Sequence, residues 1–323
     1  MLEFGFWIGV TAAGMTLAAP ILYPALGGLI SERSGVLNIG LEGLMLFGAF
    51  CGAATGAASG SPWVGFLAAI GVGAGLGLVF AYLTVSRAAN QVVVGLGFNI
   101  VALGATGYLL NRFPKTGSPT DVPGFGRLFD GIADASELGR VVNQTAPVFF
   151  GFALVPLVWW VLYRTNWGLA LRACGDHPES VDALGLNVVR IRYEAVVAGG
   201  MLAAAGGAVL SLSNLHIFVE GMTSGRGFLA LAAYTFGKWR PLGTLAACVL
   251  FGVGDALQLR MQTLGFSAPF ELMVAVPYIL ALLALVGLVG RSQAPKAVGA
   301  AFLPDRSRQS KRAPARDAET IRS

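Results

Sequence analysis

Polar side chains at helical spacing inside otherwise apolar segments are the residues of this sequence that could do chemistry. Asn38 and Glu42 lie four residues apart, so a helix would place both on one face. Asp255 and Gln258 lie three apart in a second apolar segment, and Asn99 lies in a third. Such groups are costly to bury unless they face protein or water. Two interpretations stay open: the five side chains line a path for a polar solute, or they bond to neighbouring backbone and helices.

The segment around Pro178 contains the signals of a short helix with defined ends. Pro178 suits the first turn, Glu179 complements the helix dipole there, and Gly185 suits the position after the last turn. The spacing predicts a helix over residues 178–184, with Val181 and Leu184 on one face. A short helix that presents an apolar side chain is what a docking surface for another protein requires. The alternative is an amphipathic loop helix that lies on a bilayer.

Several catalytic chemistries are excluded by the motifs that the sequence lacks. Gly237-Lys238 is followed by tryptophan and lacks the earlier glycine of a P-loop, so the chain cannot hydrolyse ATP alone. His177, His216 and the three cysteines have no metal-ligand spacing, so no metal site is predicted. Ser267 and His216 could pair as an intramembrane nucleophile and base, but no motif supports them. We therefore expect neither an enzyme nor a chain that binds a cofactor.

Composition places these residues in a bilayer. The chain of 323 residues is 55% hydrophobic and 12% charged, whereas about 25% charged residues are usual in a soluble domain. Apolar stretches of about 20 residues predict an all-α polytopic membrane protein with about nine transmembrane helices, of which the seventh is short. The predicted spans cover residues 6–30, 36–58, 63–85, 92–110, 148–163, 193–213, 227–236, 242–261 and 270–290.

Charge is concentrated near the end of the chain, which divides the sequence into two parts. Residues 1–290 form the predicted transmembrane domain, and residues 291–323 hold eight Lys or Arg against three acidic residues. Prolines and scattered charge predict a disordered basic tail. The distribution of basic residues places the loop 164–192 and the C-terminus in the cytoplasm and the N-terminus outside. A nucleic-acid-binding protein would instead spread its basic groups over a folded face.

A weak inverted repeat is a further pattern in the residues. Gly43-Leu-Met-Leu-Phe-Gly-Ala-Phe resembles Gly227-Phe-Leu-Ala-Leu-Ala-Ala-Tyr, and a proline-led apolar span follows each segment. An odd number of predicted crossings separates the two copies, so the second copy is inverted in the membrane. Inverted repeats are common in transporters, where the permeation path lies at the repeat interface.

Three motifs of this sequence resemble permease subunits of bacterial ABC importers. They are Gly35-Val-Leu-Asn-Ile-Gly-Leu-Glu-Gly43, Leu171-Arg-Ala-Cys-Gly-Asp-His-Pro178 and Gly225-Arg-Gly-Phe-Leu-Ala-Leu-Ala-Ala-Tyr-Thr-Phe-Gly-Lys-Trp239. The resemblance is to the ribose and branched-chain amino acid permease superfamily and, within it, to the nucleoside (guanosine-type) branch. It covers nearly the whole chain before the tail. Cys174, Asp176 and His177 depart from the usual Arg-Ala-Val-Gly-Glu-Asn-Pro loop but keep its glycine and proline.

The resemblance implies a membrane subunit with several partners. These would be a cytoplasmic ATPase that hydrolyses ATP, a second homologous permease and an extracytoplasmic substrate-binding lipoprotein, at the bacterial plasma membrane and among its lipids. The helix over residues 178–184 would then be the coupling helix in the ATPase groove. We expect inward transport of a small solute, with a nucleoside as the first candidate. The alternatives are a permease for simple sugars such as ribose, or a proton-coupled secondary transporter that uses Glu42 or Asp255.

Overall fold

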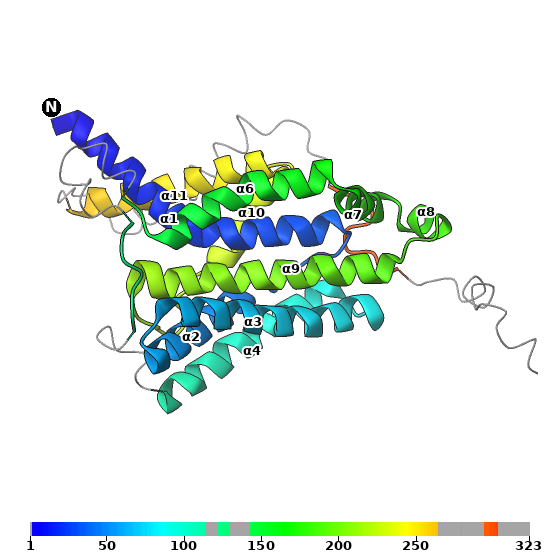
Figure 1. The fold of residues 1–323 in the computed structure, drawn as a ribbon, viewed down its shortest axis with the longest axis horizontal. Helices are drawn as coiled ribbons and strands as arrows, with labels where there is room; N and C mark the ends of the chain where they lie inside the picture. The colour runs from blue at the N-terminus through cyan, green and yellow to red at the C-terminus, as the bar shows by residue number, and fades with distance from the viewer. Residues whose placement is uncertain (1, 114–121, 129–142, 264–278, 280–293, 303–323) are drawn as a thin grey trace, which may run out of the picture.

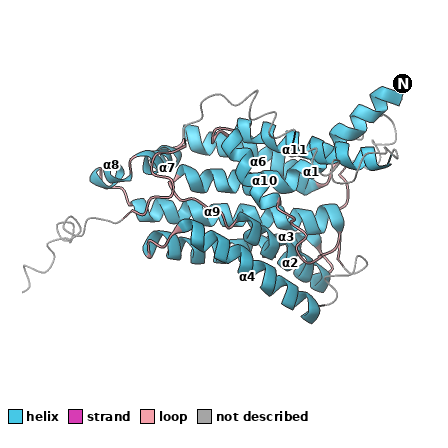
Figure 2. Cartoon of the chain, turned by 180° about the vertical axis from the view of Figure 1, so that it is seen from behind, coloured by secondary structure: helices cyan, strands magenta, loops and turns pink. Residues whose placement is uncertain are grey.

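The structure is a computed structural model that describes residues 2–113, 122–128, 143–263, 279 and 294–302. This part of the chain is helical, with one isolated bridge between Arg127 and Thr145. The long helices lie roughly along one direction (Figure 1, and from behind in Figure 2). The helices are α1 (Leu2–Arg33), α2 (Leu41–Ser59), α3 (Pro62–Ala81) with the π-helical turn η1 (Tyr82–Ser86), α4 (Gln91–Arg112), α6 (Ala146–Arg164), α7 (Asn166–Asp176), α8 (Pro178–Ala183), α9 (Val188–Val209) with the π-helical turn η3 (Leu210–Leu215), α10 (Arg226–Phe236) and α11 (Pro241–Thr263).

The two ends of the bundle are distinct. Helices α7 and α8 lie together at one end, which we call the α8 end, and the N-terminus lies at the opposite end (Figure 1). The α7–α8 segment falls inside the predicted loop 164–192. We did not expect α7 from the sequence, although Thr165 gives it a conventional start by accepting a hydrogen bond from the Gly168 backbone N–H.

Seven helices of the described residues are long and apolar enough to cross a membrane. They are α1, α2, α3 with η1, α4, α6, α9 with η3, and α11. The predicted all-helical membrane fold is therefore confirmed, but the predicted nine spans are not. Residues 227–236 belong to α10, whose 11 residues rise only about 16 Å, half the thickness of a hydrocarbon core. Apart from Ile279, the predicted span 270–290 lies outside the described residues.

Helix α9 forms the centre of the bundle because glycines let three other helices approach it closely. A Cβ on Gly27 of α1 would lie 2.6 Å from the Gly199 carbonyl oxygen, and one on Gly73 of α3 would overlap the α9 backbone. A Cβ on Gly207 of α9 would overlap the carbonyl oxygen of Met45 on α2. Close backbone approach increases van der Waals contact, which holds helices together where lipid weakens the hydrophobic driving force. The bundle thus fixes α1, α2 and α3 around one central helix.

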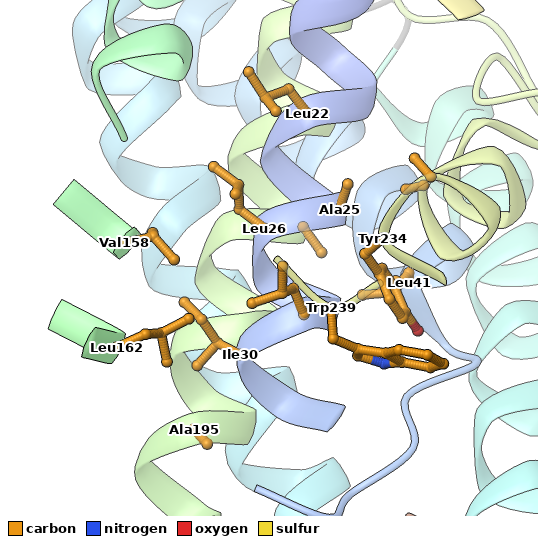
Figure 3. Packing of buried hydrophobic residues seen from close by; sticks show 14 of the residues in the cluster. Leu22, Ala25, Leu26, Ile30, Leu41, Val158, Leu162, Ala195, Tyr234 and Trp239 are labelled. Atoms are coloured by element: carbon orange, nitrogen blue, oxygen red, sulfur yellow. The ribbon is translucent and has the colours of Figure 1, made fainter. Parts of the chain in front are cut away.

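A buried apolar cluster near the α8 end joins helices from both halves of the chain (Figure 3). Burying a large apolar side chain away from water is worth about 1.5–3 kcal/mol, but contact with lipid offers the same side chain much of that gain. Shape and hydrogen bonds must therefore specify the arrangement, and Tyr234 and Trp239 supply both. Other labelled members are Leu22, Ala25, Leu26 and Ile30 of α1, Leu41 of α2, Val158 and Leu162 of α6, and Ala195 of α9.

Part of the predicted disordered tail packs against the α8 end. The backbone N–H of Ala297 donates to the Gly175 carbonyl oxygen at 2.8 Å, and that of Gly299 donates to Gly35 at 3.2 Å. The predicted disorder therefore does not apply to residues 294–302. This stretch carries a single charge, on Lys296, and is otherwise apolar. The high charge of residues 291–323 as a whole, on which the prediction rests, is therefore not a property of residues 294–302. Residues 303–323 lie outside the described residues.

Candidate functional site

A carboxylate joins the starts of two helices in the interior of the bundle. Glu42 lies in the first turn of α2, and its Oε1 accepts a hydrogen bond from the Gly225 backbone N–H at 2.8 Å. Its Oε2 accepts one from the Gly227 N–H at 2.6 Å. These N–H groups belong to the start of α10, where the helix dipole favours a negative charge. Gly225 has φ +83°, a conformation that few other residues adopt readily.

Side chains of α4 hold the non-helical residues that precede α2. The sequence predicts a span from residue 36, with glycines at 35, 40 and 43 that permit a break in the helix, and the helix begins at Leu41. Asn99 accepts a hydrogen bond from the Gly43 N–H at 2.9 Å and donates one to the Ile39 carbonyl oxygen at 3.1 Å. The Oε1 of Gln91 accepts one from the Leu37 N–H at 2.7 Å. Irregular backbone is tolerated at membrane depth only when protein or water satisfies it, and α4 does so here.

Asn38 shapes this same turn from inside. Its side chain is fully buried, and its Oδ1 accepts a hydrogen bond from the Gly40 N–H at 3.0 Å. Among the described residues, its Nδ2 has no hydrogen-bond partner. The structure therefore brings Asn38, Glu42 and Asn99 together, as the sequence suggests, but it engages them with backbone groups. These contacts favour the second of the two interpretations for this trio.

Helices α2 and α10 start beside each other and lead in opposite directions. α10 leads to Trp239, whose carbonyl oxygen accepts hydrogen bonds from Arg33 at the α8 end. α2 leads toward the opposite end of the bundle (Figure 1). A Cβ on Gly56, in its last turn, would lie 3.5 Å from the Pro123 side chain. The two segments of the weak sequence repeat thus meet at their starts, while the inverted repeat itself stays a prediction. We call the contact between their starts the α2–α10 junction, and it is the candidate site of this chain.

Asp255 and Gln258 lie on a different wall from the junction trio. Both are half-buried on α11, which packs mainly on α1, α10 and α6. The Arg226 guanidinium interacts electrostatically with the Asp255 carboxyl group. Arg226 is the first residue of α10, on which α11 packs, so Asp255 lies on a helix that adjoins α10. The five predicted residues therefore form two groups around the start of α10.

Polar residues that lead into α10 were missed by the sequence reasoning. Glu220 and Ser224 are exposed, and a Cβ on Gly107 of α4 would lie 2.8 Å from the Glu220 carboxylate oxygen. Glu220 thus reaches a membrane-spanning helix rather than lying beyond it. The signal was present, because a predicted span of only ten residues requires the segment before it to enter the membrane.

A second carboxylate fastens the other end of α10. Glu32 accepts a hydrogen bond from the Tyr234 hydroxyl and another from the Trp239 Nε1–H, each at 2.6 Å. Lys238 and Trp239 have φ of +56° and +51°, so the turn after α10 is strained and needs such partners. Figure 3 shows Tyr234 and Trp239 among the buried apolar side chains. Helix α10 is therefore clamped at both ends by carboxylates that flank the break between α1 and α2.

Helix α8 presents one apolar side chain and buries another. The helix runs from Pro178 to Ala183, and Gly185 follows with φ +90°, close to the predicted ends. Val181 is buried in the core cluster, whereas Leu184 is 81% exposed. The predicted common face is thus divided, with Val181 as an anchor and Leu184 as the exposed tip. Glu179 is exposed in the first turn.

Residues with nucleophilic or metal-binding chemistry do not assemble in the described part of the chain. Burial raises the pKa of the Cys174 thiol to about 11, against the opposing charge of Arg192, so the thiol is protonated at neutral pH. No group of three His, Cys, Asp or Glu side chains suited to a metal ion occurs within the described ranges. What the geometry offers is therefore positioning of helices rather than covalent chemistry.

Comparison with known proteins decides the family. The family described as "Branched-chain amino acid transport system / permease component" matches residues 10–285. The chain belongs to this permease family. The guanosine ABC transporter permease protein NupQ of Bacillus subtilis (strain 168) is 38% identical to this permease, over 91% of this chain and 96% of NupQ. Residues 10–285, which the family matches, contain the junction, α7, α8 and α10 but not residues 294–302.

Two further relatives widen the range of solutes in the family. The nucleoside ABC transporter permease protein NupC of Lactococcus lactis is 31% identical over 91% of this permease and 96% of NupC. TsgC13 of Haloferax volcanii, provisionally named a glucose ABC transporter permease protein, is 40% identical over 81% of this permease and 80% of TsgC13. No solved structure shows significant similarity to the chain.

Proposed function

We propose that this permease is the membrane subunit of an ABC importer that carries a nucleoside into the cytoplasm. Two relatives named for guanosine or nucleoside transport match 91% of the chain. The run from Asn38 to Gly43, which resembles the nucleoside branch, builds the α2–α10 junction. A simple sugar is the second candidate solute, because a relative provisionally named for glucose is 40% identical.

The observation that supports the mechanism is the exposed tip of α8. Leu184 projects from a helix whose Val181 is anchored in the core. The sequence has no P-loop, so energy from ATP has to enter through another chain. In this proposal α8 sits in the groove of a cytoplasmic ATPase, with Pro178, Glu179 and Gly185 defining its ends.

The remaining partners follow from this orientation. The α8 end and the C-terminus face the cytoplasm, and the N-terminus faces outside, across the bacterial plasma membrane. A second permease of the family completes the pair, and an extracytoplasmic lipoprotein delivers the solute to the opposite end. Closure of the ATPase on ATP moves α8 and switches access to the path, a transition of the hinge type.

The path in this proposal passes the α2–α10 junction. Asn38, Glu42 and Asn99 shape it, because they hold the starts of the two helices. Asp255 and Gln258 are half-exposed on α11 and line it from the other side. Polar groups at the interface of an inverted pair are suited to a polar solute that crosses the membrane.

The test is uptake by the complete transporter in proteoliposomes loaded with ATP. We expect uptake of labelled guanosine that requires ATP, and Leu184→Arg abolishes it because an added charge at the tip cannot be buried in an apolar groove. Leu169→Arg is the matched control, since Leu169 is an exposed leucine at the same end on α7 rather than on α8. Unchanged uptake by Leu184→Arg would contradict the role of α8.

Competition separates the candidate solutes and mechanisms. Unlabelled nucleosides should reduce guanosine uptake, whereas glucose, ribose and leucine should not. Inhibition by glucose alone would favour the sugar alternative. A protonophore should leave uptake intact, because an ATP-driven importer does not need a proton gradient. A proton-coupled transporter that uses Glu42 or Asp255 would instead lose its driving force and stop. Uphill uptake by this polypeptide alone would refute the proposal that it is an ABC subunit.

A further inference from the structure

Residues 294–302, which we call the strap, connect two parts of the α8 end that are distant in sequence. The Ala297 N–H donates to Gly175 near the end of α7, and the Gly299 N–H donates to Gly35 just beyond α1. The Lys296 N–H also donates to the Asp176 carboxylate, at 3.4 Å. The backbone of the strap therefore bridges α7 and the non-helical residues before α2.

A buried arginine of α9 contacts the strap through a hydrogen bond and an aromatic ring. Arg192 is only 1% exposed, and its Nη1 donates to the Ala300 carbonyl oxygen at 3.1 Å. The Phe302 ring lies 5.8 Å from the Arg192 guanidinium, within cation–π range. A Cβ on Gly35 would lie 2.8 Å from Arg192 Nη2, so only glycine leaves room for this side chain. A buried charge is costly unless it has partners. Within the described residues the strap supplies one carbonyl oxygen and one aromatic ring to Arg192, whose Nε and Nη2 have no hydrogen-bond partner there.

The positions of the two anchor points suggest what the strap does. Gly175 lies three residues before Pro178, where α8 begins, and Gly35 lies three residues before Asn38 of the junction. A Cβ on Gly175 would overlap the Arg33 carbonyl oxygen, so the end of α7 also rests directly on the end of α1. A displacement of α8 that carries the end of α7 with it therefore also pulls on residues 35–40, unless the strap releases one of its two anchors.

We propose that the strap transmits movement of α8 to the break between α1 and α2, with Arg192 and Phe302 as its positioning residues. This inference rests on the proposed function, in which an ATPase moves α8. It assigns a mechanical role to a segment that lies beyond the residues matched by the permease family. The strap couples ATP hydrolysis to transport, and it contacts no solute.

Two truncations of the assembled transporter test the role of the strap. A chain that ends at residue 302 keeps the strap and loses the rest of the tail, whereas a chain that ends at residue 293 loses both. The measured quantity is the number of ATP molecules hydrolysed per nucleoside imported. We expect the shorter chain alone to raise this ratio by about two- to thirtyfold, the range of typical coupling energies. Equal ratios in both truncations would overturn the inference.

Point variants keep the test decisive if the shorter chain fails to assemble. Arg192→Met removes the hydrogen bond to Ala300 and the charge at similar volume, and Arg192→Lys should restore part of the coupling. Arg190→Met is the matched control, because Arg190 lies two residues earlier on α9 with its side chain 78% exposed. A wild-type ratio in Arg192→Met would overturn the role of Arg192.

Hydrogen exchange separates failure of the strap from failure of the proposed function. In the assembled complex, loss of the strap should speed amide exchange in residues 35–40 and 175–186 by about tenfold, because these segments open more easily once the strap N–H groups no longer hold the Gly35 and Gly175 carbonyl oxygens. This measurement needs no transported solute. If the wild-type complex imports no nucleoside, the proposed function fails, while unchanged exchange after strap removal would refute the link itself.

Discussion

Two glutamates accept hydrogen bonds at the two ends of α10. Glu42 accepts two backbone N–H groups at its start, and Glu32 accepts two side-chain donors near its end. A carboxylate at membrane depth is costly unless each oxygen has a donor, and here each oxygen has one. The same atoms therefore stabilise the observed state and must release their partners if α10 moves.

We expect Glu42→Gln to lower stability through a single unpaired donor. A glutamine amide has one acceptor oxygen, so either the Gly225 or the Gly227 N–H loses its partner. An unsatisfied buried donor costs about 1–3 kcal/mol. Thermal unfolding in detergent should show a lower midpoint than wild type, whereas Glu179→Gln on the exposed surface of α8 should not. An unchanged midpoint would mean that water replaces the carboxylate at the junction.

The Cys174 thiol should be unreactive in the folded protein. Its pKa of about 11 lies above the ordinary value of about 8.5, so the thiol stays protonated between pH 7 and 9. Maleimide labelling at pH 7.5 should be at least about a hundredfold slower than that of Ser180→Cys, in a background of Cys51→Ala and Cys248→Ala. Equal labelling rates would show that the site opens.

The raised pKa of Cys174 also predicts how its contribution to stability depends on pH. Because a thiol with a raised folded-state pKa favours the neutral form, its contribution is complete below about pH 8.5. It falls as the pH rises toward 11, where the folded thiol itself titrates. Replacing Cys174 with alanine should therefore flatten the stability profile in that range.

At the scale of elements, α3 and α9 show how small residues decide helix packing. Gly73 and Gly77 of α3 face α9, whereas Gly71 and Gly75, on the same helix, have open space at their Cβ positions. The Gly-x-x-x-Gly spacing therefore has two registers, and only one of them is used for packing. Sequence spacing alone does not distinguish the two, since both place their glycines one turn apart.

A matched pair of substitutions tests this use of glycine. Gly73→Val would force its side chain into the α9 backbone at Gly200, so the yield of folded protein and its thermal midpoint should fall. Overpacking of this kind costs about 1–3 kcal/mol or more. Gly75→Val has nothing within 4 Å of its Cβ and should remain close to wild type. The reverse order of stabilities would contradict the α3–α9 packing.

At the scale of the whole molecule, α2 and α10 begin next to each other and leave toward opposite ends. Helix α2 begins five residues later than its predicted segment 36–58, whereas α10 covers its predicted segment 227–236, and non-helical residues precede each start. Where two helix starts meet inside a bundle, their backbone N–H groups make the interior locally polar. The path of the proposed function therefore does not need charged side chains along its whole length. The strap and α8 gather at one end, so the molecule has one end for control and another for solute entry in the proposed function.

The orientation of these ends can be measured with impermeant maleimide. Ser59→Cys lies at the end opposite α8, and Ser180→Cys lies on α8 itself. In intact cells carrying Cys51→Ala and Cys248→Ala, Ser59→Cys should react at once. Ser180→Cys should react only after permeabilisation, because charged reagents do not cross the bilayer. Labelling in the reverse order would invert the proposed topology.

The sequence by itself determined the membrane environment, the helical class and the ends of α8. Apolar composition and helix length depend on single segments, and the signals at Pro178 and Gly185 act within a few residues. The choice of Asn38, Glu42 and Asn99 also follows from the cost of polar groups in apolar helices. The hydrogen-bond partners of these side chains do not follow from that cost.

Only the tertiary structure decided those partners. Glu42 finds Gly225 across 183 residues, Asn99 finds Gly43 across 56, and Arg192 finds Ala300 across 108. Such contacts form because the packing of α2 against α4 and α10, and of the strap against α9, brings distant backbone together, and no local pattern predicts them. The same packing interrupts a predicted helix before Leu41 and orders residues 294–302, since hydrogen bonds to distant groups there outweigh local preference.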